Sequence, residues 1–299
     1  MLKTMFAVAR INFLSLTLVC VLLAAAAAWQ IDADQNFFHL ALIGVMALCA
    51  HVSVNAFNEF FDFRSGLDLL TRRTPFSGGS GGLVANPAAS HLALALALVT
   101  LAVVVIIGLY LAWQVGWRLL WIGIPGVLLI YAYTQYVNRW PLVCLLAPGA
   151  GFGLMMTLGA FWVLHGQITL GAVSLALILT LLVSNLLLLN QFPDVEADVQ
   201  VGRRHLPIAI GRKRSATVFA ILWISSYAIL LVAVLQQWLP AQTLLALITA
   251  PLLRKLLPGV LRHADEPDRL LPYMALNVAL CHAYPLLLSA GLIWAAFKP

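Results

Sequence analysis

The sequence predicts an all-α polytopic membrane protein with nine transmembrane helices and a cytoplasmic N-terminus. Composition is the first reason, because the 299 residues have a mean hydropathy of +0.97, 63% are hydrophobic and only 9% are charged. The second reason is that apolar stretches recur at lengths of about 20 residues, which is what a helix needs to cross a bilayer. The third is that lysine and arginine collect in alternate connections between these stretches.

The nine apolar stretches can be placed in order along the chain. They lie near residues 11–29, 37–57, 91–113, 118–137, 143–163, 169–192, 215–236, 240–257 and 271–296. The first is rich in alanine but longer than the core of a signal peptide, and no polar mature domain follows it, so we interpret it as a retained helix. The eighth is the weakest, because Pro240, Pro251 and Pro258 interrupt it and Arg254 and Lys255 shorten it.

The basic residues predict the orientation of these helices. An odd number of spans puts the termini on opposite sides, and of the 17 lysine and arginine residues only Arg118 and Lys298 then fall on the side away from the N-terminus. The positive-inside rule therefore places the N-terminus in the cytoplasm, and we expect an integral protein of a bacterial inner membrane. The same rule explains the net charge of +6 without a nucleic-acid partner.

Two polar clusters interrupt the apolar pattern, and both fall at cytoplasmic ends of predicted spans. In a chain with 11 acidic residues, carboxylates beside lipid are costly and indicate a functional site. Each cluster precedes a long connection, so residues 1–299 are predicted to form one domain with a first half-site at 37–90 and a second at 169–214. The clusters consist of Asn55, Asn58, Asp62 and Asp68 in the first half-site and Asn190, Asp194 and Asp198 in the second.

The spacing of these residues predicts a row of oxygen ligands. Residues four apart share one face of a helix, and both Asn58 with Asp62 and the series Asn190, Asp194 and Asp198 have this spacing. A set with oxygen atoms only, without histidine or thiolate, favours a hard cation such as Mg²⁺. Arginines follow each cluster and suit a diphosphate, whose oxygens they can bind in pairs.

Such a site at a membrane surface suits the ionisation of an allylic diphosphate, since Mg²⁺ and arginine neutralise the departing pyrophosphate. The carbocation then needs an apolar pocket, and aromatic ring faces can stabilise it. The glycine-rich segment GGSGG has the composition of a phosphate-binding loop without the strand and helix context, so we interpret it as a flexible connection. The aromatic candidates are Phe57, Phe60, Phe61, Tyr131, Tyr133, Tyr136 and Phe192.

At these residues the chain resembles the UbiA superfamily of intramembrane prenyltransferases. The first family signature is similar to Asn58, Asp62 and Asp68, and the second to Asn190, Asp194 and Asp198 with the segment GRRHLPIAIG at 202–211. The six-residue step from Asp62 to Asp68 is most similar to the branch that prenylates 1,4-dihydroxy-2-naphthoate. Glu59 and Arg203 stand where the family often has aspartate and lysine.

The resemblance implies nine helices around a central cavity and a transferase that moves a polyprenyl group from an isoprenyl diphosphate to an aromatic or other lipophilic acceptor. Asp62, Asp194 and Asp198 are the predicted catalytic residues. The metal set is expected to be Asn58, Asp62, Asp68, Asn190, Asp194 and Asp198 around Mg²⁺. The diphosphate set adds Arg64, Arg72, Arg203 and Arg204 to Asn58, Asp68 and Asn190.

Two other functions fit the same residues. A membrane terpene cyclase uses the same ionisation and quenches the carbocation internally, and no feature of the sequence separates it from a transferase. A transporter or channel also carries intramembrane carboxylates. It predicts polar residues near mid-span, whereas these clusters lie at span ends. The sequence predicts contact with membrane lipids and gives no oligomeric state.

Overall fold

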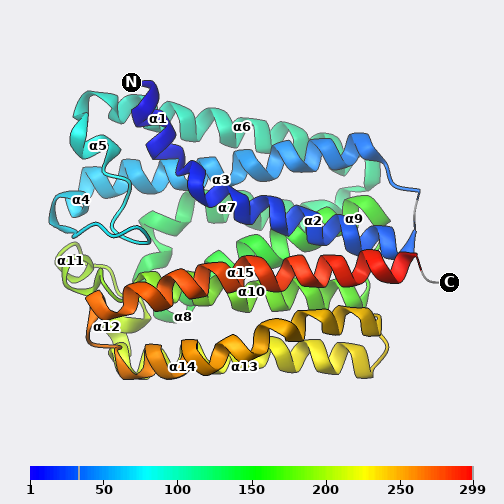
Figure 1. The fold of residues 1–299 in the computed structure, drawn as a ribbon. Coiled ribbons are helices and arrows are strands. Elements are labelled where there is room, and N and C mark those ends of the chain that lie inside the picture. The colour runs from blue at the N-terminus through cyan, green and yellow to red at the C-terminus, as the bar shows by residue number, and fades with distance from the viewer. Residues whose placement is uncertain (33, 298–299) are drawn as a thin grey trace.

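The computed structural model describes residues 1–32 and 34–297, and across these residues every regular element is helical and no strand occurs (Figure 1). Nine helices in this part of the chain are long and apolar enough to span a bilayer, which confirms the predicted fold class. Lys298 lies outside the described residues, and the side of the N-terminus stays a prediction. The nine are Leu2–Ile31, Phe37–Ser65, Pro87–Val115, Trp117–Gln135, Pro141–His165, Leu170–Asn190, Arg212–Leu235, Ala241–Arg262 and Pro267–Ala296.

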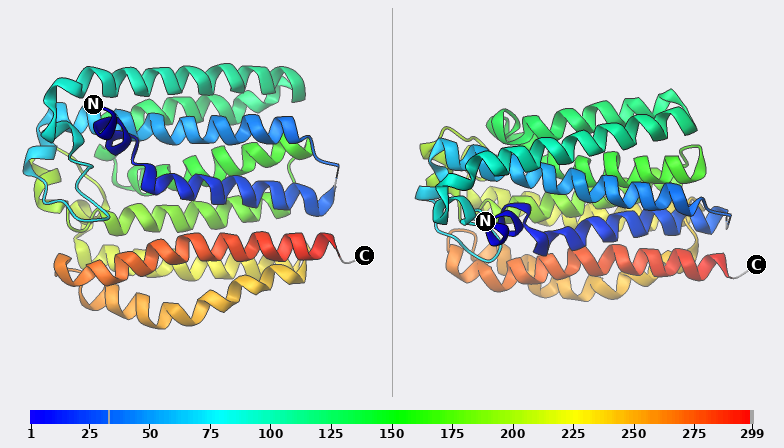
Figure 2. Two further views of the ribbon diagram at one scale, coloured as in Figure 1. Left: turned by 45° about the horizontal axis from the view of Figure 1, so that its top comes forward. Right: turned by 90° about the horizontal axis from the view of Figure 1, so that it is seen from above.

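The helices pack side by side along one common direction (Figures 1 and 2). Helix α3 (Phe37–Ser65) contacts α6 (Ser90–Val115), α7 (Leu120–Gln135) and α2 (Leu14–Ile31). On the other side, α10 (Leu170–Asn190) contacts α13 (Arg212–Leu235) and α15 (Pro267–Ala296). Helix α15 packs on α2 and on the 3₁₀ segment Ala241–Leu252, which continues into α14 (Leu253–Arg262). Helix α10 is the most buried span.

Between the two sides, the fifth span approaches α10 closely. This span consists of α8 (Pro141–Ala150), a π-helical segment (Gly151–Thr157) and α9 (Leu158–His165). A Cβ atom on Gly149 would lie 2.0 Å from the Thr180 carbonyl oxygen, and one on Gly153 would lie 2.2 Å from that of Ala176. Only glycine allows this backbone contact, which is a common way for membrane helices to associate. Segments of π-helix often mark functional sites, and here the segment faces a cavity.

The first span differs from the prediction because it begins at Leu2 and breaks at Arg10. Arg10 adopts a left-handed backbone with φ 49°, which is unusual for a residue with a side chain. Helix α1 (Leu2–Ala9) therefore turns away from the axis of α2 (Figure 2). The break leaves the Arg10 side chain pointing into the bundle, toward α3.

Both long connections gather at one end of the bundle (Figure 1). The first contains α4 (Leu67–Leu70) and α5 (Gly82–Ala85), and the second contains α11 (Val195–Gln200) and α12 (Leu206–Ile210). Helix α3 stops at Gly66, whose φ of 79° suits glycine and turns the chain back into α4. Helices α4 and α11 pack against each other, so residues from both half-sites meet at this end.

Candidate functional site

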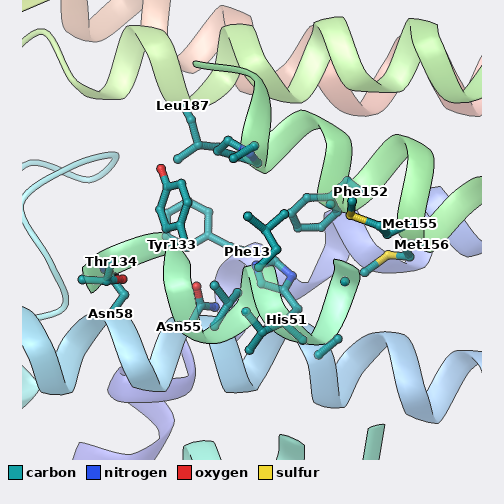
Figure 3. A pocket seen from close by; sticks show the side chains of 18 of the residues that line it. Phe13, His51, Asn55, Asn58, Tyr133, Thr134, Phe152, Met155, Met156 and Leu187 are labelled. Atoms are coloured by element: carbon teal, nitrogen blue, oxygen red, sulfur yellow. Dashed lines mark hydrogen bonds between the residues drawn. The ribbon is translucent and has the colours of Figure 1, made fainter. Parts of the chain in front are cut away.

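A cavity of about 540 Å³ runs through the bundle and ends among the polar residues of the two connections. On α3 alone the lining residues extend from Ile43 to Asp62, which at about 1.5 Å per helical residue corresponds to a depth of roughly 28 Å. Most of the lining is apolar, with Met155 and Met156 lying away from Asn58 (Figure 3). The cavity thus joins a long hydrophobic chamber to a polar mouth.

All six residues of the predicted metal set line this one cavity: Asn58, Asp62, Asp68, Asn190, Asp194 and Asp198. The structure therefore brings together two clusters that are more than a hundred residues apart in sequence. Within residues 1–32 and 34–297, however, no three histidine, cysteine, aspartate or glutamate side chains are grouped closely enough to form a metal site by themselves. One reason is that the guanidinium of Arg203 lies between two of the carboxylates, those of Asp62 and Asp198.

Arg203 stands between carboxylates of the two half-sites. Its guanidinium donates to Asp62 and also to Asp198 Oδ1 at 3.0 Å, while His205 Nε2 lies 2.9 Å from Asp198 Oδ2. Burial lowers the pKa of Arg203, but the charges of Asp62 and Asp198 outweigh this and raise it above its ordinary value. A turn at Gly202, with φ 77°, returns the chain from α11 so that Arg203 reaches the mouth.

Asp68 and Asp194 differ from this pair because each keeps a buried oxygen without a hydrogen-bond partner in the described part of the chain, Oδ2 in Asp68 and Oδ1 in Asp194. Burial and neighbouring carboxylates raise the pKa of each to about 7. Buried carboxylate oxygens that lack donors are the atoms a hard cation requires as ligands. The donor set therefore fits Mg²⁺, and the fit rests on these two orphaned oxygens.

The glycine-rich loop lies over the mouth and is held there by Glu59. Glu59 is fully buried and accepts hydrogen bonds from the Ser80 backbone N–H at 2.8 Å and from the Ser80 hydroxyl at 2.6 Å. Arg10 donates to the same carboxylate from Nε at 2.9 Å and from Nη2 at 2.6 Å. A Cβ atom on Gly79, where φ is 73°, would lie 2.8 Å from Asp68 Oδ1. The loop thus packs its backbone directly on the carboxylates, in a defined conformation rather than as the loose connection we expected.

Asn58 connects this loop anchor to the acidic mouth. Its side-chain amide nitrogen donates to Asp62 Oδ2 at 3.0 Å and to Thr134 Oγ1 at 3.2 Å, and its side-chain oxygen accepts from Arg10 Nη2 at 2.9 Å. Figure 3 shows Asn58 beside Thr134. Arg10 therefore supplies positive charge to the site, although it directly precedes the first predicted apolar stretch and sequence reasoning gave it no role in the site. Its only sequence signal was a charge at the start of that stretch.

Three of the four predicted diphosphate-binding arginines do not line the main cavity. Arg72 forms an exposed ion pair with Asp268 at 3.0 Å. The Arg64 guanidinium lies 5.7 Å from the centre of the Phe60 ring. Arg204 is exposed, and its backbone N–H donates to the Asn138 carbonyl at 2.9 Å. Only Arg203 of this set reaches the chamber mouth, so these positions give no support to a diphosphate-binding role for the other three.

The aromatic prediction has a similar outcome. Of the seven candidates, Tyr133 alone lines the main cavity. Phe57 is fully buried on a different face of α3, where it stacks on Phe61 with ring centres 5.8 Å apart. The other aromatic rings that line the cavity come from positions that sequence reasoning did not select, namely Phe13, Phe76 and Phe152.

In the described residues, nine helices long enough to cross a bilayer enclose an apolar chamber with a carboxylate-rich mouth, which indicates an integral membrane protein. The chain belongs to the UbiA prenyltransferase family, whose profile matches residues 17–294. This confirms the resemblance seen in the two sequence signatures.

Several known proteins are similar to the chain. It is 28% identical over 242 residues to the 1,4-dihydroxy-2-naphthoate octaprenyltransferase of Bacillus subtilis (strain 168), covering 77% of this chain and 74% of the relative. The apo structure of a UbiA homolog from Aeropyrum pernix K1 has a TM-score of 0.69 at 18% identity, over 93% of this chain and 97% of that one. A UbiA homolog from Archaeoglobus fulgidus bound to GPP and Mg²⁺ has a TM-score of 0.59 at 12% identity, over 96% and 99%. At these identities the two structures establish the fold.

Proposed function

We propose that this protein transfers a polyprenyl group from an isoprenyl diphosphate to an aromatic or other lipophilic acceptor in quinone biosynthesis, with Mg²⁺ as cofactor. The observation that carries the proposal is the shape and chemistry of one cavity, in which an apolar chamber roughly 28 Å deep opens into a mouth with four carboxylates and two arginines. An isoprenyl diphosphate has the same division into an apolar tail and an anionic head.

The mouth is the proposed head-group site, shared by the half-sites at 37–90 and 169–214. The residues that would hold Mg²⁺ are Asp62, Asp68, Asp194 and Asp198, assisted by Asn58 and Asn190. Bound there, Mg²⁺ would neutralise charge that develops on the departing pyrophosphate. The bound state of the Archaeoglobus fulgidus homolog, with GPP and Mg²⁺, supports this cofactor. Arg203 and Arg10 line the same mouth and suit the remaining diphosphate oxygens.

The chamber walls support the transfer step itself. When the C1–O bond of the donor breaks, the electron pair leaves with pyrophosphate and an allylic carbocation remains. The apolar walls exclude water that would otherwise capture it, and the Tyr133 ring at the chamber mouth offers an electron-rich face. A carbon of the acceptor then bonds to C1, and an aromatic acceptor loses the proton from that carbon to restore its ring.

The acceptor and the compartment follow from two further observations. The name of the Bacillus subtilis relative supports a 1,4-dihydroxy-2-naphthoate type of acceptor. The concentration of lysine and arginine at the end that carries the mouth supports a cytoplasm-facing site in a bacterial inner membrane. Both substrates would then enter from the side on which soluble precursors are made.

The proposal is tested by product identification. Purified full-length protein in lipid nanodiscs is incubated with Mg²⁺ and isoprenyl diphosphates of several lengths, with and without 1,4-dihydroxy-2-naphthoate, and products are analysed by mass spectrometry. We expect a prenylated naphthoate derivative that depends on both substrates. A cyclic hydrocarbon or alcohol formed without acceptor would instead indicate a terpene cyclase and contradict the transferase.

The matched variants for this test are Asp194→Ala and Asp268→Ala. Asp194 lines the mouth, whereas Asp268 is exposed at the same end of the bundle and lies outside the cavity. We expect Asp194→Ala to abolish product formation while the protein stays folded, and Asp268→Ala to retain it. Full activity in Asp194→Ala would contradict the placement of the site.

A further inference from the structure

A second, smaller cavity lies behind the acidic mouth. This crevice has a volume of about 240 Å³, and eight of its ten lining residues are polar or charged. That volume corresponds to about eight water molecules at roughly 30 Å³ each in the liquid. The crevice is therefore large enough for a hydrated inorganic ion, and its walls lack the apolar character of the main chamber.

The crevice and the main chamber share four residues: Asp62, Thr134, Asn138 and Arg203. Arg203, which is bonded to Asp62, is the one basic side chain among these shared residues. Asp62, Thr134 and Asn138 are buried, so the shared wall is the floor of the crevice. At its rim stand Arg64 and Arg139, both exposed.

The charge of the crevice selects for an anion. Three arginines face one carboxylate, that of Asp62. Among the described residues, the Arg139 side chain has no hydrogen bond or ion pair, and the Arg64 guanidinium contacts only the Phe60 ring at 5.7 Å. The two rim arginines therefore keep their donors available. Arginines line the crevice from its exposed rim to its buried floor, so they can bind a phosphate compound with several negative charges at each point along it.

We propose that this crevice is the route by which pyrophosphate leaves the site after transfer, a step that rests on the proposed function. On the other side of the mouth, the loop at Ser77–Gly79 covers the carboxylates and Glu59 holds it in place, while most of the remaining chamber is apolar. A free pyrophosphate can cross neither lipid nor apolar walls. In this proposal the Arg203 side chain, which lines both cavities, moves aside with the leaving anion and joins the mouth to the crevice at Arg64 and Arg139.

The test compares release of pyrophosphate with formation of the prenylated product in one single-turnover reaction. Product is measured after rapid quenching, and released pyrophosphate with pyrophosphatase and a fluorescent phosphate sensor. Two altered proteins are used: Arg139→Gln, and Val201→Trp, which places a bulky side chain in the crevice but not in the main chamber. Arg214→Gln removes an exposed charge at the same end of the bundle and is the control.

We expect product formation at the wild-type rate in all four proteins, within about twofold, which also shows that they are folded. Release should fall behind product formation by at least about threefold in the two crevice variants and not in Arg214→Gln. Release that keeps pace with product formation in both crevice variants overturns the proposed route. Absence of prenylated product in the wild type would instead contradict the proposed function, so the two failures are distinguishable.

Discussion

Replacing Arg203 by methionine should destabilise the metal-free protein far more than an arginine replacement at the surface. Arg203 is bonded to Asp62 and to Asp198, and all three side chains are at least four-fifths buried. Removing one partner of a buried ion pair leaves an uncompensated charge and typically costs about 3–5 kcal/mol. Arg72, which pairs with Asp268 in an exposed position, provides the matched control, because such pairs contribute about 0–1 kcal/mol.

The assay is thermal unfolding of each variant in detergent with EDTA, followed by tryptophan fluorescence. At about 2–4 °C per kcal/mol, we expect Arg203→Met to lower the midpoint by on the order of 10 °C and Arg72→Met by less than about 3 °C. Excess Mg²⁺ should restore more stability to Arg203→Met than it adds to wild type, by up to about 2.7 kcal/mol when its concentration is a hundred times the dissociation constant. Equal midpoints for the two variants, or no response to Mg²⁺, would refute the reasoning.

Three further predictions concern the loop anchor, the carboxyl groups and the chamber. Glu59→Gln should loosen the glycine-rich loop and increase trypsin cleavage at Arg72 or Arg73 by about tenfold, since a hydrogen bond to a charged group contributes about 1.5–3 kcal/mol. The control is Glu196→Gln, because the Glu196 side chain is 69% exposed. Equal cleavage rates in the two variants would argue against the role of Glu59 as the loop anchor. Because the pKa values of Asp68 and Asp194 are raised from 3.8 to about 7, these groups stabilise the metal-free protein most near pH 4 and lose that contribution as the pH rises through 7. Apparent Mg²⁺ affinity should rise over the same pH range. A thermal unfolding midpoint in EDTA that does not decrease as the pH is raised from about 5 to about 8 would contradict the pKa shifts. Gly123→Phe should shorten the longest isoprenyl diphosphate that the protein accepts, because Gly123 lines the chamber about 16 Å along α7 from Thr134 and has open space beside it. Unaltered use of long isoprenyl diphosphates would show that the isoprenyl tail does not lie beside Gly123.

The spans, and the polar residues that line the cavity mouth, were predictable from the sequence because each depends on short-range patterns. A run of about 20 apolar residues is sufficient to indicate a helix that crosses a bilayer. Asn58 and Asp62 share a helix face through their four-residue spacing, and that face continues through Asn55 and His51 into the chamber wall. Positive charge at one side then indicated that both clusters meet at the same end.

The arginines and the aromatic residues were less predictable because their positions depend on the path of loops and on helix rotation. Arg72 follows the first cluster closely, yet after the turn at Gly66 it reaches an exposed ion pair with Asp268. Arg64 lies on α3 before that turn, and its guanidinium lies against the Phe60 ring. Arg10 reaches the mouth only because the first span breaks there in a left-handed conformation, for which no glycine gave warning. Phe57 and Phe61 lie four residues apart, but on the face of α3 that packs toward Tyr131.

The measurement that bears most directly on the proposed chemistry is the stoichiometry of a Mg²⁺-dependent reaction. Wild-type protein should release one pyrophosphate for each prenylated acceptor formed, with both products absent in EDTA. The double variant Asp68→Asn with Asp194→Asn, which removes the two orphaned carboxylates, should form neither product at any Mg²⁺ concentration while its thermal midpoint in EDTA is preserved or raised. Coupled formation of both products at the wild-type rate by this double variant would show that the carboxylate-rich mouth is not where the diphosphate is cleaved.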